Sequence, residues 1–131
     1  MANVWPNKFL FTNKTVVVTG GAGLIGSQLC TTFAEAGANV VIGECNKEKA
    51  TQLEKTINKS GYCAKYMDLD ITSEDSVINI INNTVKKYGN IDVWVNCAYP
   101  RTSDWGAKFE DIKFESWKKK DRKSTRLNSS H

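Results

Sequence analysis

The segment TGGAGLIG at residues 19–26 constrains the fold of this chain more than any other part of its sequence. It follows the run TVVV at residues 15–18, which is β-branched and too short for a helix, and so predicts a buried strand. Residues 25–36 then predict a helix that ends at Gly37, a residue suited to the left-handed position after a helix. A glycine-rich turn that leads from a strand into a helix is typical of α/β folds.

Short apolar runs and amphipathic stretches alternate along the rest of the chain. Further strands are predicted at residues 39–42, 62–67 and 91–95, with one helix at residues 47–59 and another between residues 73 and 87. Successive parallel strands need helical crossovers, so this alternation implies a parallel sheet covered on both faces. We therefore predict a Rossmann-like, doubly wound α/β fold that is truncated after about four strands.

The helix before the fourth predicted strand carries signals at both of its ends. Thr72 or Ser73 can cap its first turn, and Lys86 and Lys87 lie before Gly89, the charge order that the helix dipole favours. Four apolar residues share one face of this helix: Val77, Ile80, Ile81 and Val85. We expect that face to be buried against the sheet.

Composition restricts the class of protein. The chain has 131 residues, of which 40% are hydrophobic and 24% are charged, and this fits one globular domain. No run approaches the ~20 apolar residues of a membrane span. The first residues lack the apolar core and the cleavage site of a secretory signal. We expect a cytoplasmic protein without a membrane partner.

Metal binding and catalysis through histidine find little support in the sequence. The four cysteines include no C-x-x-C pair and no zinc-ribbon spacing, so we expect free thiols and no metal site. The single histidine is His131, the last residue. A Ser-His or Cys-His arrangement would have to be built on a terminal tail, and we discard that chemistry.

The last eleven residues, 121–131, read DRKSTRLNSSH and hold three basic residues and one acidic residue. A basic tail can bind nucleic acid, but no second basic cluster or aromatic platform accompanies this one, so we expect no nucleic-acid partner. All eleven residues also match one reading frame of a widely used short-read sequencing adapter. We therefore expect a non-native tail that takes no part in the fold.

The glycine-rich turn contains the pattern G-x-G-x-x-G as Gly21, Gly23 and Gly26, between a predicted strand and a predicted helix. A dinucleotide pyrophosphate must approach such a backbone closely, which a Cβ would block, and N–H groups at the helix start supply donors and positive potential. At Gly21 we expect the backbone to bend with a positive φ that β-branched residues resist. The alternative is that the glycines only make a tight turn. The placement of the pattern favours dinucleotide binding.

Glu44 lies at the end of the second predicted strand, where a carboxylate can accept hydrogen bonds from the hydroxyls of an adenosine ribose. A carboxylate there repels a 2′-phosphate, and the next residue is Cys45 and not an arginine that could bind one. We therefore predict NAD as the cofactor, with NADP less favoured. The alternative is that Glu44 is a solvated residue at a strand end.

Several segments together resemble the N-terminal half of a short-chain dehydrogenase/reductase. They are TGGAGLIG, the acidic strand end, DLDIT and KKYGNIDVWVNCA. The resemblance implies that Asp70 binds the adenine amino group and that Ile71 packs beside the ring. The family's Asn-Asn-Ala-Gly segment corresponds to Asn96, Cys97, Ala98 and Tyr99, of which Asn96 and Ala98 match and the other two depart.

A further departure lies in the glycine spacing. Leu24 occupies the usual second glycine of T-G-x-x-x-G-x-G, which gives the spacing of the sugar-nucleotide epimerase branch, whereas GNIDVWVNCA resembles the single-domain dehydrogenases. We choose the single-domain branch. The candidate cofactor-binding residues are Gly20, Gly21, Gly23, Leu24, Ile25, Gly26, Glu44, Asp70, Ile71, Asn96 and Ala98.

The family's chemistry uses a serine and a Tyr-x-x-x-Lys pair, in which the tyrosine is the general acid/base toward the substrate oxygen. None of the four tyrosines of this chain has a lysine four residues later, so no catalytic residue is assigned. The resemblance implies an oxidoreductase parent that moves hydride between nicotinamide and an alcohol or carbonyl carbon, with its catalytic half missing here. The expected layout is an arm at residues 1–13, an incomplete NAD-binding domain at 14–120 and the tail at 121–131.

Two other functions stay open: a non-catalytic nucleotide-binding module, and a relative of sugar-nucleotide epimerases or dehydratases. The resemblance implies that the loop at residues 100–117 borders a small-molecule substrate. The sequence of this loop weakly resembles that of dehydrogenases from surface-polysaccharide loci, which suggests a sugar-related substrate. The alternative is an ordinary surface loop whose Trp105, Phe109 and Phe114 pack inward. We expect the intact parent to be a homo-oligomer.

Overall fold

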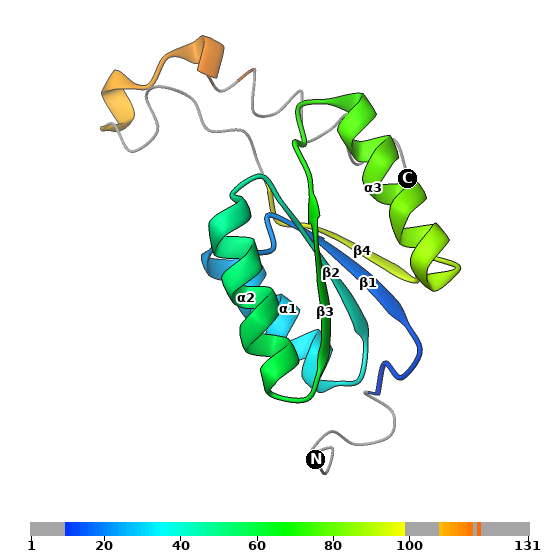
Figure 1. Ribbon diagram of the computed structural model, residues 1–131. Coiled ribbons are helices and arrows are strands. Elements are labelled where there is room, and N and C mark those ends of the chain that lie inside the picture. Colours follow the sequence, from blue (N-terminus) through cyan, green and yellow to red (C-terminus); the bar gives the residue numbers. More distant parts are fainter. Residues whose placement is uncertain (1–9, 99–107, 117, 119–131) are drawn as a thin grey trace. The chain divides into compact units, whose positions relative to one another are not determined.

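The computed structural model describes residues 10–98, 108–116 and 118 (Figure 1). The chain divides into two units, residues 1–98 and residues 99–131. Most of the expected N-terminal arm and all of the adapter-like tail lie outside the described residues.

The first unit is a parallel four-stranded sheet with helices on both of its faces (Figure 1). Its strands are β1 (Thr15–Thr19), β2 (Asn39–Glu44), β3 (Cys63–Asp68) and β4 (Val93–Asn96), in the order β3-β2-β1-β4. Its helices are α1 (Leu24–Glu35), α2 (Lys47–Lys59) and α3 (Glu74–Tyr88). Helices α1 and α2 lie on one face and α3 lies on the other (Figure 1). This confirms the predicted Rossmann-like, doubly wound arrangement.

The strands differ from the predicted ranges mainly at their ends. β2 continues two residues beyond Ile42, because Gly43 pairs with Thr19 and Glu44 pairs with Asp68 in the parallel ladders. β4 begins at Val93, two residues later than predicted, where it pairs with Val16. Pairing between distant segments decides these ends, and no local pattern reports it.

The core lies mainly between the sheet and the pair α1 and α2. Strand β1 is buried along its whole length. Alternate strand residues point to one face and meet small side chains of the two helices. The buried cluster on this face contains Val16, Val18, Cys30, Ala34, Ala38, Val40, Ile42, Ala50, Ile57 and Ala64. On the opposite face, Val17 and Val41 are fully buried on the side where α3 lies.

Helix α3 has the predicted caps, but its buried face is rotated from the predicted one. Ser73 accepts the N–H of Ser76 at 3.2 Å, and Gly89 follows the helix with φ of +91°. Val85, predicted as buried, is 42% exposed, whereas Thr84 is fully buried. The Thr84 hydroxyl donates to the carbonyl of Ile80 at 2.6 Å. Because this bond satisfies the hydroxyl, a threonine can take the core position beside the apolar residues.

The second unit contributes a short 3-10 helix, η2 (Phe109–Asp111). Phe114 is 69% exposed, with Nζ of Lys118 at 4.9 Å from its ring centre. The alternative of inward packing is therefore wrong for Phe114, and Trp105 and Tyr99 lie outside the described residues. Within the part of the chain that the structure describes, no helix is long and apolar enough to cross a membrane.

Candidate functional site

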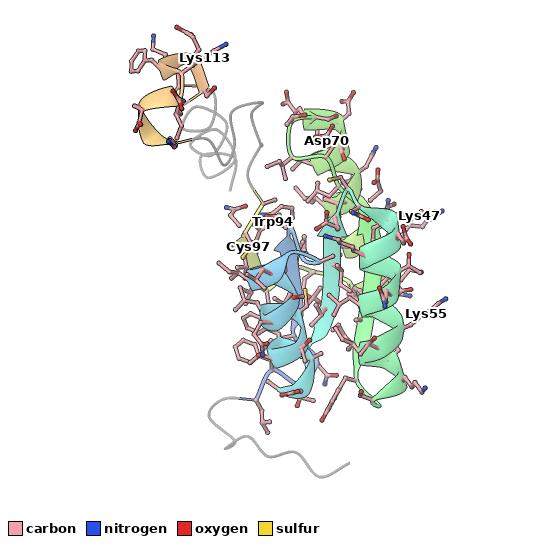
Figure 2. The ribbon with its side chains drawn as sticks, turned by 90° about the vertical axis from the view of Figure 1, so that its left-hand side faces the viewer. Lys47, Lys55, Asp70, Trp94, Cys97 and Lys113 are labelled. Carbon is pink, nitrogen blue, oxygen red and sulfur yellow. The ribbon has the colours of Figure 1, made fainter. Side chains whose placement is uncertain are left out.

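All strands of the sheet are parallel, so the segments that follow them meet at one edge. The glycine turn follows β1, Glu44 ends β2, Asp70 comes two residues after β3, and Asn96 ends β4. Asp70 and Cys97 lie toward this end of the sheet (Figure 2). The strand order reverses between β1 and β4, and ligands of open α/β sheets bind beside such a reversal. The structure thus brings the predicted site residues to one edge.

The backbone of the glycine turn is held mainly by the end of β2. The N–H groups of Gly20 and Gly21 both donate to the carbonyl of Gly43, at 2.8 and 3.2 Å. The N–H of Gly23 returns to the carbonyl of Gly20 at 3.0 Å. The N–H of Ala22 donates to a carboxylate oxygen of Glu44 at 3.2 Å. The turn therefore has a defined course, with partners for its own donors.

The start of α1 has donors that the turn does not use. Gly23 is the N-cap and offers no side-chain bond, and the first helical bond runs from Ser27 to its carbonyl at 2.9 Å. Among the described residues, the N–H groups of Leu24, Ile25 and Gly26 have no hydrogen-bond partner. The side chains of Leu24 and Ile25 are 93% and 69% exposed. Free N–H groups at the positive end of a helix suit an anionic ligand.

The glycines of the turn are needed for different reasons. Gly20 has φ of +66°, and a Cβ there would lie 2.9 Å from the backbone N of Ala98. A Cβ on Gly26 would overlap the carbonyl oxygen of Gly20. A Cβ on Gly21 would lie 2.9 Å from Cγ2 of Ile42 and would press into the core. The predicted positive φ at Gly21 is therefore wrong: it occurs at Gly20, and Gly21 is small because the core lies beneath it.

Glu44 joins the glycine turn to the start of α2. One oxygen, Oε1, accepts the Ala22 N–H, and Oε2 accepts the N–H groups of Cys45 and Asn46 at 3.1 and 3.0 Å. Burial, together with the nearby Glu44 carboxylate, raises the pKa of the Cys45 thiol. The carboxylate lies beside the turn, as predicted, and it is also an acceptor for three backbone donors.

Thr19 is a site residue that the sequence analysis did not single out. Its buried hydroxyl oxygen accepts the N–H groups of Cys97 and Ala98, at 3.0 and 3.1 Å. These bonds hold the segment after β4 against the glycine turn, so that Ala98 touches Gly20. A threonine at the end of a buried strand, directly before a glycine, is the signal that could have identified it.

The remaining predicted residues lie at the same edge in local networks. Asp70 Oδ1 accepts the backbone N–H and the hydroxyl of Thr72, at 2.9 and 2.7 Å, which orders the turn before α3. Asn96 Oδ1 accepts the indole N–H of Trp94 at 2.8 Å. Ile71 is half-buried. These contacts hold the side chains in place at the edge.

The four cysteines are free thiols. Burial raises the pKa of the Cys30 thiol to about 12, and burial also raises the pKa of Cys97. Both groups are therefore protonated at neutral pH. Within the described ranges, no group of three or more His, Cys, Asp or Glu residues is placed to hold a metal ion.

Comparison with known proteins identifies the family. The family model for short chain dehydrogenase matches residues 14–120. The chain belongs to the short-chain dehydrogenase family. This confirms the resemblance drawn from the glycine turn, the acidic strand end and the segment after the fourth strand.

Individual relatives agree with this membership. An uncharacterized oxidoreductase of Thermotoga maritima is 37% identical over 89 residues, which are 68% of this chain and 35% of that protein. A 7alpha-hydroxysteroid dehydrogenase of Bacteroides fragilis is 36% identical over 66% of this chain and 33% of its own length. The crystal structure of gox2181 superimposes with a TM-score of 0.75 and 32% identity, over 86% of this chain and 43% of that chain. The chain thus spans about a third of the length of these two curated relatives.

Proposed function

We propose that this chain is the cofactor-binding N-terminal portion of an NAD-dependent oxidoreductase. The observation that carries the proposal is the set of unpartnered N–H groups at Leu24, Ile25 and Gly26, beside the carboxylate of Glu44. The N–H groups suit a diphosphate, and the carboxylate suits the hydroxyls of the adjacent ribose.

The residues at this edge fit one dinucleotide in an extended pose. Gly23 would let the diphosphate approach the backbone, while Gly20, Gly21 and Gly26 give the turn the course that leads into the free N–H groups of α1. Asp70 and Ile71 would hold the adenine, and Asn96 and Ala98 would flank the part of the cofactor next to β4. When bound, the nicotinamide would accept or deliver hydride. This chain's own residues bind and orient the cofactor.

The choice of NAD over NADP rests on the acceptors and charges around Glu44. A 2′-phosphate would meet a carboxylate that already accepts three backbone N–H groups. The next residues, Cys45 and Asn46, bring no positive charge, and Asn46 caps α2. Like charges at this range repel each other.

The reaction itself belongs to the longer parent. We propose that the parent moves hydride between nicotinamide and an alcohol or carbonyl carbon of a small-molecule substrate, with a serine and a Tyr-x-x-x-Lys pair beyond residue 120. The names of the relatives, which include a hydroxysteroid dehydrogenase and oxidoreductases, favour this class over epimerases. A sugar-related substrate, a cytoplasmic location and a homo-oligomeric parent remain part of this proposal.

Titration calorimetry with the 131-residue chain tests the cofactor assignment. We expect NAD and ADP-ribose to compete for one site, with NADP binding at least ~1.4 kcal/mol more weakly, a factor of about ten. The substitution Glu44→Ala should weaken the binding of NAD and reduce the difference between the affinities for NAD and NADP. The matched control is Asp68→Asn. Asp68 is the residue of β3 that pairs with Glu44 in the sheet, and its exposed carboxylate accepts only the Tyr66 hydroxyl among the described residues.

Two outcomes would contradict this assignment. A preference of the unaltered chain for NADP would overturn the role of Glu44. If Asp68→Asn changed the ratio of the NAD and NADP affinities as much as Glu44→Ala does, the preference would reflect the net charge of the surface and not the Glu44 carboxylate.

Sequencing the gene across the codon for Lys120 separates the enzyme from a non-catalytic module. Under the proposal, the reading frame continues and encodes a serine followed by Tyr-x-x-x-Lys. A natural stop codon there would instead favour a nucleotide-binding module without chemistry.

A further inference from the structure

One peptide of the glycine turn, which joins Gly21 to Ala22, is held at both ends by side chains. Its carbonyl oxygen accepts the thiol of Cys30, with Sγ at 3.5 Å. Its N–H donates to Oε1 of Glu44 at 3.2 Å. No other peptide of the turn has side-chain partners on both sides among the described residues.

Cys30 is built into the core directly beneath the turn. It lies on α1, its side chain is fully buried, and its sulfur would be 3.1 Å from a Cβ on Gly21. Because burial raises the pKa of this thiol to about 12, the sulfur keeps its proton and remains a donor at neutral pH. A single S–H bond is weak, but this one is shielded from water.

Glu44 holds the peptide from the opposite side. Its other oxygen is fixed by the N–H groups of Cys45 and Asn46, at the start of α2. These two bonds fix the position of the carboxylate whose other oxygen accepts the Ala22 N–H. It links the glycine turn to a second helix.

This peptide needs such partners because of the residue before it. Glycine adopts positive and negative φ about equally readily, so the peptide that follows Gly21 can rotate at little cost in free energy. Rotation by half a turn would exchange the two ends of the peptide, so that the Gly21 carbonyl would face the Glu44 carboxylate and the Ala22 N–H would face the Cys30 sulfur. The carbonyl and the carboxylate would then repel each other, and the turn that leads into the free N–H groups of α1 would lose both of its side-chain bonds.

We propose that Cys30 and Glu44 are positioning residues that fix the Gly21–Ala22 peptide and thereby set the glycine turn in its binding conformation before the cofactor arrives. The gain is pre-organisation, because the ordering of the turn is completed during folding and not during binding. The part that concerns affinity rests on the proposed function. The part that concerns the ordering of the turn does not, since it is measured without cofactor.

The test compares three variants of the 131-residue chain by amide hydrogen exchange, read by NMR without ligand, and by ADP-ribose affinity. Cys30→Ala removes the donor, Cys30→Ser keeps a donor, and Ala34→Gly loosens the same helix at a buried position one helical turn after Cys30. For Cys30→Ala we expect faster exchange at Ala22 and affinity weaker by roughly threefold, the size of one weak hydrogen bond. Cys30→Ser should restore both toward the starting values.

The outcomes separate this inference from the proposed function. If Ala34→Gly accelerates exchange at Ala22 as much as Cys30→Ala does, or if Cys30→Ala leaves it unchanged, the positioning role is overturned. If exchange responds as expected but affinity does not, the turn is ordered for stability alone and the proposal fails. If ADP-ribose does not bind the unaltered chain at all, the proposed function fails, while the exchange result still decides whether the peptide is held.

Discussion

At the residue scale, the glycine turn shows that one residue type can meet several physical demands within a few positions. Gly20 supplies a left-handed backbone and a close approach to Ala98. Gly21 leaves room for the side chains of Ile42 and Cys30, and Gly26 leaves room for the carbonyl of Gly20. A substitution in this turn therefore tests conformation, core packing or backbone contact according to its position.

The first prediction separates the contact made by Gly20 from its backbone conformation. Gly20 and Gly89 both have positive φ, at +66° and +91°, but a Cβ on Gly89 would have no atom within 4 Å. Gly89→Ala should cost about 1 kcal/mol of unfolding free energy from conformation alone. Gly20→Ala should cost more, by roughly 1–3 kcal/mol, because its Cβ also meets the backbone of Ala98.

Urea unfolding followed by circular dichroism measures both losses. The two free energies should differ clearly, with Gly20→Ala the less stable variant. Equal losses would mean that the segment around Ala98 moves aside without cost, and the close approach would then have no role in stability.

At the element scale, the outer edge of β3 is covered by side chains of α2. Asn58 accepts the N–H of Ala64 at 2.9 Å and donates to the carbonyl of the same residue at 3.0 Å. Glu54, one turn earlier, accepts the N–H of Tyr66. These bonds satisfy backbone groups that would otherwise be open to pairing with another chain.

The second prediction concerns this cover. Asn58→Ala should lower the unfolding free energy by about 1–3 kcal/mol, because it leaves the donor and the acceptor of Ala64 without their partner. It should also increase self-association, measured by light scattering. The matched control is Lys55→Ala on the same helix, whose side chain points away from the sheet (Figure 2). If both variants lose the same unfolding free energy and associate to the same degree, the hydrogen bonds of Asn58 to Ala64 do not protect the edge of β3.

At the scale of the whole molecule, the two edges of the sheet differ. The β3 edge carries the α2 side chains, whereas β4 pairs only with β1 among the described residues. Val93, Trp94 and Val95 are only half-buried. An apolar edge strand of this kind is a template for association.

The third prediction is that the 131-residue chain on its own self-associates through this edge as its concentration rises, so the binding, exchange and unfolding measurements above use concentrations at which the chain is monomeric. Trp94→Lys should reduce association because it places a charge on the edge strand. The control Gln52→Lys adds the same charge on the exposed surface of α2 and should have little effect. Size-exclusion chromatography with light scattering measures association, and circular dichroism verifies that the helices persist. A chain that stays monomeric at every concentration would show that the open edge is tolerated.

Local patterns were sufficient for much of this architecture. The bounds of α2 at residues 47–59 and the glycine turn between β1 and α1 depend on neighbouring residues, and both were predicted. Ser73 was one of the two residues predicted to cap α3. The parallel sheet also followed, because alternating strands and helices permit few other arrangements. The family resemblance depended on the same segments.

The tertiary structure decided what depends on residues far apart in the sequence. The start of β4 at Val93, the burial of Thr84 in place of Val85 and the positive φ at Gly20 each follow from a contact or pairing that no local pattern records. The partners of Thr19 lie 78 and 79 residues away, and Cys30 reaches the turn only because α1 folds back against the sheet. Periodicity and propensity act over a few residues, whereas close packing and hydrogen bonding act between any groups that the fold brings together.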